Sequence, residues 1–343
     1  MNILVTGGAG FIGSNFIKYL LEKYDYTIVN LDLLTYAGNL KNLKDIELNS
    51  NYHFVEGDIC NRELVEEVFS RFDIQVVINF AAESHVDRSI ENPKLFLETN
   101  ILGTEVLLQV AKNYWAVGNK KYKTNAKFYQ ISTDEVYGTL GKEGFFTETT
   151  NLSPNSPYSA TKASADMIAR AYFETYGLPL LLSRCSNNYG PFQFPEKLIP
   201  MVIESAMKDR EIPIYGNGKQ IRDWLHVEDH CSAIDQILHS GRIGEVYNIG
   251  GNNEKENIEV VQQVLRELEK EDSLIEFVDD RLGHDLRYAI DNTKITNELG
   301  WKPRYTFEEG LALTIKWYLE NNEWLEAIDT KKTVEDVEKW VKN

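Results

Sequence analysis

A glycine-rich turn near the start of the chain restricts the fold more than any other feature. Gly7, Gly10 and Gly13 have the spacing GxxGxxG in the segment TGGAGFIG, directly after the apolar residues 3–5. Glycine lets a backbone turn sharply, approach a pyrophosphate closely and pack a helix against a strand. The amide groups at the start of the following helix would face the phosphates. The turn therefore predicts a βαβ unit that binds a dinucleotide.

An acidic residue at the end of the next apolar segment indicates which dinucleotide binds. Asp32 follows Gly13 by 19 residues, and no Arg or Lys stands beside it in LDLLTYAG. A carboxylate at this point can accept both ribose hydroxyls of NAD and would repel the 2′-phosphate of NADP. The expected cofactor is therefore NAD. The alternative is an aspartate that only forms a turn.

Short apolar segments alternate with helical ones through the first half of the chain. We expect strands at residues 3–5, 27–31, 53–56, 76–80, 127–132 and 245–249, and helices at 13–23, 62–71, 94–113, 157–176, 198–208, 227–239, 259–269 and 308–321. Such alternation predicts an α/β fold, a doubly wound parallel-sheet Rossmann fold with a smaller, interleaved mixed α/β C-terminal substrate domain. Residues 1–185 would form the NAD-binding domain, with the strand near 245–249 returning to it. Residues 186–343 would mainly bind the substrate.

Composition excludes several classes of partner. The 36 Lys and Arg against 53 Asp and Glu give a formal net charge of −17, which disfavours nucleic acid and anionic membranes. Three separated cysteines, no export segment and no membrane-length apolar run favour a cytoplasmic protein. The six histidines have no metal-ligand spacing, so we expect no metal, and His85 is interpreted as a residue that positions a loop.

A second motif suggests hydride chemistry. Tyr158 and Lys162 lie four residues apart near the start of a well-capped helix and share one face of it. The ammonium group and the helix dipole are expected to lower the tyrosine pKa, so that the phenolate can take a hydroxyl proton. Thr133, Asp134 and Glu135 follow a predicted strand, at the edge where open parallel sheets bind ligands. Taken alone, these motifs could instead be a solvated helix pair and an acidic turn.

Together the segments GGAGFIG, STDEVYG and YSATK resemble the extended short-chain dehydrogenase/reductase family. AAESHVDRSI, CSNNYGPFQFPEKLIP, GNGKQIRDWLHVEDH and GHDLRYAID resemble its nucleotide-sugar 4,6-dehydratases. The resemblance implies dehydration of dTDP-glucose to the 4-keto-6-deoxy sugar: oxidation at C4, loss of water across C5 and C6, and hydride return to C6. It implies that Glu135 is the C5 base and Asp134 the acid, and it points to deoxysugar (rhamnose-type) biosynthesis. A pair of carboxyl groups can divide these roles if their environments separate their pKa values.

The resemblance also implies the binding residues. Those for NAD are Gly7, Gly10, Phe11, Ile12, Gly13, Asp32, Leu33, Thr35, Asp58, Ile59, Ala81, Ala82, Thr99, Tyr158, Lys162 and Asn188. Those for the nucleotide sugar are Glu83, Ser84, Thr133, Asn187, Lys197, Leu198, Pro213, Tyr215, Arg222, Asn248, Arg281, His284 and Tyr288. Arg222 is the leading candidate for the pyrophosphate, with an internal Arg222–Asp223 pair as the alternative. Leu282 and Leu286 depart from the family, which usually has proline and arginine there.

Two alternatives remain open at this point. One is another epimerase or dehydratase of nucleotide sugars on the same fold, although such epimerases have no need of Asp134 and Glu135. The other is a regulator that senses NAD without turnover, although both Tyr158 and Lys162 are present. The family further suggests a homodimer joined through residues 94–113 and the helix that carries Tyr158.

Overall fold

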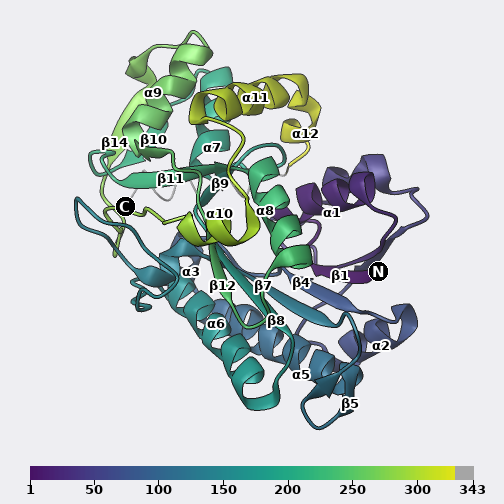
Figure 1. The fold of residues 1–343 in the computed structure, drawn as a ribbon. Helices are drawn as coiled ribbons and strands as arrows, with labels where there is room; N and C mark the ends of the chain where they lie inside the picture. Colours follow the sequence, from purple (N-terminus) through teal and green to yellow (C-terminus); the bar gives the residue numbers. More distant parts are fainter. Residues whose placement is uncertain (329–343) are drawn as a thin grey trace.

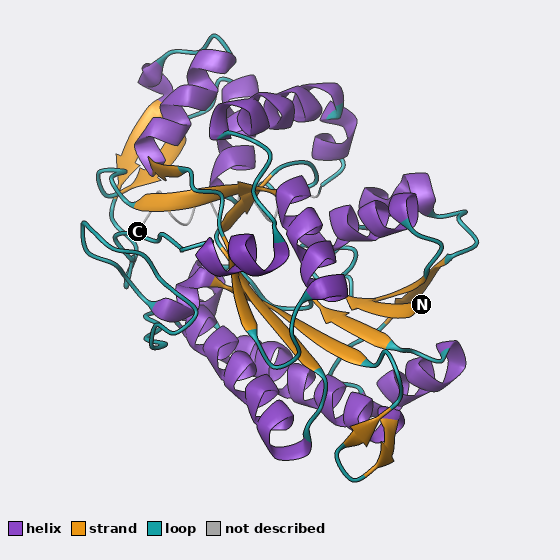
Figure 2. Cartoon of the chain, in the orientation of Figure 1, coloured by secondary structure: helices purple, strands orange, loops and turns teal. Residues whose placement is uncertain are grey.

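A seven-stranded parallel sheet forms the centre of the computed structural model, which describes residues 1–328 (Figures 1 and 2). Its strand order is β12-β8-β7-β4-β1-β2-β3, and every neighbouring pair is parallel. The strands are β1 (Asn2–Thr6), β2 (Thr27–Asp32), β3 (Tyr52–Glu56), β4 (Val76–Asn79), β7 (Lys127–Thr133), β8 (Leu180–Cys185) and β12 (Val246–Ile249). The predicted doubly wound parallel sheet is confirmed.

Helices cover both faces of this sheet, as Figure 1 shows. The helices α1 (Phe11–Lys23) and α8 (Val227–Ser240) lie on one face, and α2 (Arg62–Phe72), α5 (Thr104–Trp115) and α6 (Pro157–Tyr176) lie on the other. Successive strand residues such as Val76, Val77 and Ile78 are fully buried because each side of the sheet has its own hydrophobic core. Burial on both faces accounts for the continuous apolar runs in the sequence.

The second half of the chain adds a smaller mixed unit with its own core, built from small sheets and helices. Its elements are β9 (Asn187–Tyr189), α7 (Leu198–Met207), β10 (Ile212–Tyr215), β11 (Ile221–His226), β13 (Glu254–Glu256), α9 (Asn257–Glu267), β14 (Ile275–Val278), α11 (Phe307–Glu320) and α12 (Asn322–Glu326). β12 lies in the main sheet beside β8, in the segment near 245–249 where the chain was expected to return to that sheet. The last part of the predicted substrate domain, 329–343, lies outside the described residues.

Several strands of the structure were not predicted from the sequence. β8 was missed because a leucine-rich run without β-branched residues carries little strand signal. β9, β10 and β11 were not predicted either, because their segments are rich in Asn, Gly and Pro, yet β11 pairs with both β9 and β13. The shorter elements are η1 (Leu40–Ile46), α3 (Val86–Glu91), β5 (Ala116–Gly118), β6 (Lys121–Tyr122), η3 (Asp134–Tyr137), η4 (Asp272–Leu274) and α10 (Thr293–Leu299).

The single helix predicted over 94–113 is wrong. The chain forms α4 (Pro93–Phe96), a π-helical segment η2 (Leu97–Gly103) and then α5. Inside the π-helical segment the buried Asn100 accepts a hydrogen bond from the Glu83 amide at 2.9 Å and donates to the Glu83 carbonyl at 3.1 Å. It also donates to the Thr161 hydroxyl at 2.9 Å. These tertiary contacts compensate for the poorer geometry of the wide turn.

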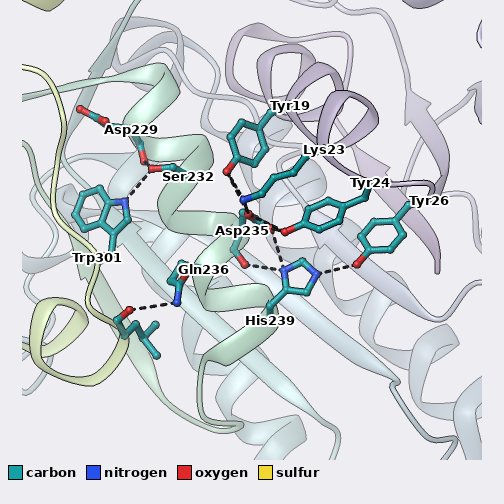
Figure 3. Close-up of polar contacts among 11 residues, drawn as sticks. Tyr19, Lys23, Tyr24, Tyr26, Asp229, Ser232, Asp235, Gln236, His239 and Trp301 are labelled. Carbon is teal, nitrogen blue, oxygen red and sulfur yellow. Dashed lines mark hydrogen bonds and ion pairs between the residues drawn. The ribbon is translucent and has the colours of Figure 1, made fainter.

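α1 and α8 are joined by a cluster of polar side chains around one buried carboxylate (Figure 3). Asp235 on α8 accepts hydrogen bonds from the Lys23 ammonium at 2.6 Å and from the hydroxyls of Tyr24 and Tyr19 at 3.0 and 3.1 Å. The His239 ring lies 2.9 Å from the same carboxylate and 3.0 Å from the Tyr26 hydroxyl. The surrounding donors outweigh burial and lower the Asp235 pKa to about 2, while the hydrogen bond to Asp235 raises the His239 pKa.

This cluster predicts a pH-dependent stability. His239 has a raised pKa in the folded protein, so its contribution is complete below the ordinary value of 6.5 and is lost as the pH rises through the folded pKa. The Asp235 contribution is present above its ordinary value of 3.8 and is lost only as the pH falls through about 2. The His239→Gln variant should therefore melt roughly 2–3 °C lower than wild type at mildly acidic pH and approach it at alkaline pH.

Melting temperatures across a pH series test this expectation. His53→Gln, on β3 at the far edge of the sheet, is the control and should keep the wild-type pH dependence. If the melting temperature of His239→Gln lay below that of wild type by the same amount at every pH, His239 would not be the source of the pH dependence.

Candidate functional site

Two joined cavities open where the strands of the main sheet end. The first, of about 320 Å³, is lined by residues that follow β1, β2, β3, β4, β7 and β8. The second, of about 200 Å³, lies between that edge and the small unit. Seven residues line both cavities: Ser84, Glu135, Asn187, Asn188, Gln193, Glu196 and Lys197. The carboxyl edge of the sheet therefore supplies a continuous site with two compartments.

The glycine-rich turn forms one wall of the first cavity. Gly7 has φ of +67°, and a Cβ atom there would stand 2.7 Å from the Ala81 amide nitrogen. A Cβ on Gly13 would stand 2.4 Å from the Gly7 carbonyl oxygen. α1 begins at Phe11 without a side-chain cap, so its first amides are available to an anion. The turn fits a pyrophosphate as predicted from its spacing.

Asp32 lies at the end of β2 in the wall of the same cavity. Its carboxylate accepts hydrogen bonds from the amides of Ala9 at 2.9 Å and Leu34 at 2.8 Å. Burial raises the Asp32 pKa, and these two amides oppose the rise. The bond to Leu34 is the turn-forming role that was the alternative, and it leaves further lone pairs for the two hydroxyls of a ribose. Both roles are compatible, and the residues fit NAD.

Reactive side chains meet at the inner end of the first cavity. Thr133 ends β7, Asp134 and Glu135 follow in η3, and Tyr158 and Lys162 project from the first turns of α6. A capping box of Ser156 and Ser159 fixes the start of that helix. The five predicted catalytic residues are thus brought together, although they come from three elements, of which α6 is separated from β7 and η3 in the sequence.

The expected lowering of the Tyr158 pKa does not occur in the surroundings that the protein itself provides. Burial raises it well above the ordinary value, and the carboxylates of Glu135 and Asp134 raise it further. The Lys162 ammonium instead donates to the Ile131 carbonyl at 2.8 Å, and burial lowers its own pKa. The helix-dipole argument failed because it left out the burial of Tyr158 and the two neighbouring acids.

The environments of the two acids separate their pKa values. Burial raises the pKa of Asp134 well above the ordinary range, and the neighbouring Glu135 and Asp223 add to the rise. Burial also raises the pKa of Glu135, but Lys197, Arg222 and Arg281 oppose it. Asp134 Oδ2 is buried and accepts no hydrogen bond from the described residues. The two acids therefore lie in different environments, which a division into acid and base would require.

Cationic and aromatic side chains line the second cavity. Arg222 donates to the carbonyls of Ile221 at 2.8 Å and Asp285 at 2.9 Å, and its guanidinium carbon lies 4.3 Å from the centre of the Tyr288 ring. Asp223 accepts instead from the amides of Gly251 and Asn253. No ion pair joins Arg222 to Asp223 in residues 1–328, so the internal-pair alternative is wrong, and the guanidinium charge faces the cavity.

Arg281, Tyr215 and His284 form the outer side of this cavity. Arg281 pairs with Asp87 through two contacts, of 2.7 and 2.9 Å, and lies 4.9 Å over the Tyr215 ring. His284 packs edge-on against Tyr215 and lies 2.6 Å from the Asp280 carboxylate. Leu282 and Leu286, the two departures from the family, are 78% and 54% exposed and do not line either cavity.

All predicted NAD-binding residues line the first cavity, and all but one of the predicted substrate residues line one or both cavities. The exception is Asn248, which the structure does not bring to either. Its side chain is fully buried, accepts from the Tyr137 hydroxyl at 2.7 Å and donates to the Phe146 carbonyl at 3.0 Å. Both polar groups of the Asn248 side chain are therefore hydrogen-bonded inside the core.

Several cavity residues were not predicted, and three of them are polar side chains that could contact a ligand: Gln193, Glu196 and Asn257. Gln193 and Glu196 lie in the GPFQFPEK segment, whose resemblance to the family could have identified them. Asn257 opens α9 and reaches the second cavity, and nothing in the sequence distinguishes it from the nearby Asn248. Within residues 1–328, no group of three His, Cys, Asp or Glu could hold a metal ion. No helix in the same part of the chain is long and apolar enough to cross a membrane.

Comparisons with known proteins agree with this geometry. Residues 4–314 match the family model described as GDP-mannose 4,6 dehydratase. A dTDP-glucose 4,6-dehydratase of Xanthomonas campestris is 52% identical over 334 residues, 95% of each chain. The dTDP-glucose 4,6-dehydratase of Bacillus anthracis, solved in complex with NAD, is 55% identical with a TM-score of 0.88, over 96% of this chain and 100% of that one. The Streptomyces venezuelae dTDP-glucose 4,6-dehydratase, with NAD and a further ligand bound, is 44% identical with a TM-score of 0.91 over the same shares.

The glycine turn gives a direct test of the first cavity. Gly13→Ala should weaken NAD binding at least about tenfold, because the new methyl group would meet the Gly7 carbonyl and push the turn into the cofactor. The measurement is the NAD content of the purified protein together with calorimetric titration of NAD. Gly300→Ala is the matched control: φ is +71° and no atom lies within 4 Å. Gly300→Ala should lower the free energy of unfolding by about 1 kcal/mol and leave NAD binding unchanged. Equal NAD affinity in both variants would contradict the placement.

Proposed function

The chain belongs to the GDP-mannose 4,6 dehydratase family, and from this premise we propose that it converts dTDP-glucose to dTDP-4-keto-6-deoxyglucose with NAD as its cofactor. The observation that carries the proposal is the acid pair Asp134–Glu135 beside Thr133, Tyr158 and Lys162, where the two cavities meet. An epimerase on this fold needs the last three residues but has no use for a separate acid and base. A regulator without turnover would need none of the five.

The first step is oxidation at C4 of the hexose. Tyr158 takes the proton of the C4 hydroxyl while the hydrogen on C4 leaves as hydride. Because burial and the neighbouring acids raise the pKa of Tyr158, this role requires the positive charge that bound NAD⁺ would add to the first cavity. Thr133 helps, because its contact with Tyr158 lowers the phenol pKa against the effect of burial. When bound, NAD supplies the hydride acceptor for C4 and later the donor to C6. The Lys162 ammonium donates to the Ile131 carbonyl, and this hydrogen bond holds Lys162 in the wall of the first cavity.

The second step is elimination of water. The new C4 ketone acidifies the hydrogen on C5, and Glu135 removes it. Asp134, kept protonated by burial and by its acidic neighbours, gives its proton to the C6 hydroxyl, which departs as water. The resulting C5–C6 double bond takes the hydride at C6 and a proton from Glu135 at C5. Tyr158 releases its proton to the solvent and Asp134 regains one from the solvent, so the balance is the loss of one water.

The nucleotide part of the substrate would occupy the second cavity. Arg222 is positioned to pair with the pyrophosphate, and Tyr215 offers a ring on which the base can stack. Lys197 donates to the Ser84 carbonyl at 3.0 Å and lies beside both compartments, next to the hexose. These cations would hold a dianionic substrate in a chain of net charge −17.

We further propose that the enzyme acts in the cytoplasm on a route to deoxysugars such as rhamnose. Its cysteines Cys60, Cys185 and Cys231 are free thiols, which suits a reducing compartment.

A homodimer is the expected assembly. Leu95, Leu102 and Met167 are 42%, 56% and 63% exposed on the neighbouring segments α4, η2 and α6. A second copy of the chain would bury them.

The activity is tested by mixing purified protein with dTDP-glucose and following the 4-keto product. Parallel reactions with UDP-glucose and CDP-glucose define the base preference. If NAD binds but no ketone forms, the regulatory alternative is correct. If a C4 epimer forms without loss of water, the protein is an epimerase.

Glu135→Gln separates the two chemical steps. The variant should still oxidise C4, so reduced nicotinamide accumulates on the enzyme. Release of dehydrated product should fall by at least about 100-fold, because the C5 proton has no base. Tyr158→Phe is the complementary variant and should show no reduction of the cofactor. Normal turnover by Glu135→Gln would show that Glu135 is not the base that removes the C5 proton.

The dimer is tested by one charge on the exposed apolar face. Leu102→Glu should halve the mass measured by analytical ultracentrifugation, because burying an unpaired carboxylate is costly. Leu48→Glu, at a position 93% exposed beyond η1, is the control and should leave the mass unchanged. A monomeric wild type, or a dimer that tolerates Leu102→Glu, would exclude this interface.

A further inference from the structure

The last described helix reaches back to the glycine-rich turn at the other end of the chain. The Trp324 indole N–H on α12 donates to the Asn42 side-chain carbonyl at 2.8 Å. The Asn42 amide group donates to the Ala9 carbonyl at 2.9 Å, and the Ala9 amide donates to Asp32 at 2.9 Å. Asn42 is 1% exposed, so its side chain has no water to replace Trp324. Three hydrogen bonds thus connect α12 to Asp32, the carboxylate that is predicted to bind the ribose of NAD.

The ring of the same tryptophan supports the segment 190–197. Trp324 packs on Phe192, with ring centres 5.8 Å apart, and Trp317 packs on the same ring at 4.6 Å. Phe192 has φ of +67°, a strained conformation that persists only where neighbours fix it. The Tyr318 hydroxyl donates to the carbonyl of the next residue, Gln193, at 2.6 Å. These contacts determine where the segment lies.

Segment 190–197 carries three of the seven residues that line both cavities: Gln193, Glu196 and Lys197. It is tied to α1 as well, because the Asn15 side chain donates to the Pro191 carbonyl at 3.0 Å and the Lys18 ammonium lies 4.1 Å from the centre of the Phe192 ring. The wall between the compartments and the glycine-rich turn therefore share one support, which includes Trp324.

We propose that Trp324 is a positioning residue that couples NAD binding in the first cavity to nucleotide-sugar binding in the second. Through Asn42 it holds the turn at Ala9, and through Phe192 it holds the segment with Gln193 and Lys197. Loss of its N–H group loosens the turn, and the altered ring loosens the segment. The part of this inference that concerns the sugar rests on the proposed function, whereas the part that concerns NAD does not.

Trp324→Phe is the test, because it keeps an aromatic ring and removes the donor. The Kd for NAD, measured by calorimetry on cofactor-free protein, should rise roughly tenfold, since a buried acceptor on Asn42 loses its partner. At saturating NAD, the KM for dTDP-glucose should rise roughly fivefold while kcat changes less than about twofold, the pattern of lost binding rather than lost chemistry. The NAD readout remains informative even if dTDP-glucose proves not to be the substrate.

Trp301→Phe is the matched control. Its indole N–H also donates to a side chain, the Ser232 hydroxyl at 2.9 Å, but Trp301 lies beside α8 and lines neither cavity (Figure 3). It should lower the melting temperature and leave Kd and KM unchanged. If Trp324→Phe behaves like this control, the residue is only structural and the inference is overturned.

A double-mutant cycle tests the route through Asn42. Asn42→Ala alone should raise the Kd for NAD, and Trp324→Phe should add less than about twofold to it, because both variants break the same chain of hydrogen bonds. Full additivity of the two effects would overturn the coupling through Asn42.

Discussion

The close approach of Gly7 to the backbone at Ala81 is the contact on which the rest of the site depends. It fixes the end of β1 against the segment that follows β4, and only a residue without Cβ allows it. From there the chain runs to Glu83, whose amide and carbonyl are both bound by Asn100, and to Ser84, whose carbonyl is bound by Lys197. The backbone of this segment is therefore fixed by the side chains of Asn100 in η2 and of Lys197 at the start of α7.

Local electrostatics oppose the overall charge at this place. A chain of net charge −17 concentrates Lys197, Arg222 and Arg281 around the second cavity, where a dianionic ligand would bind. The same cations act on Glu135 and limit the effect of burial on its pKa. Asp134, one residue away, is affected by burial and by the repulsion of Glu135 and Asp223, against which Arg222 acts. Two adjacent carboxyl groups in a single turn of 3₁₀ helix thus have different environments, as the proposed division into acid and base requires.

The features that the sequence predicts well are those determined by short-range chemistry. The glycine turn, Asp32 at the end of β2, the capped helix that starts at Pro157 and the β-branched strands all follow from local patterns. β8 was missed because leucine runs are ambiguous, and the π-helical segment because it depends on Asn100 contacting residues far along the chain. Asn248 and Asn257 cannot be distinguished without knowing which side of the small unit faces the cavity. The Tyr158 pKa was misjudged because complete burial of the phenol, together with two acids from another element, becomes evident only in the folded chain.

The π-helical segment has a consequence for how this protein can change in length. A π turn contains one residue more than an α turn over about the same rise. Deleting one residue from 97–103 would therefore let the segment close into a regular α-helix while α4 and α5 keep about the same relative orientation. The face of α5 that packs on the sheet would stay buried. The loss would fall on the contacts that Asn100 makes with the Glu83 backbone and the Thr161 hydroxyl from the wide turn. The segment can thus lose one residue without disturbing the helix layer, but only by giving up the contacts that hold the backbone at Glu83.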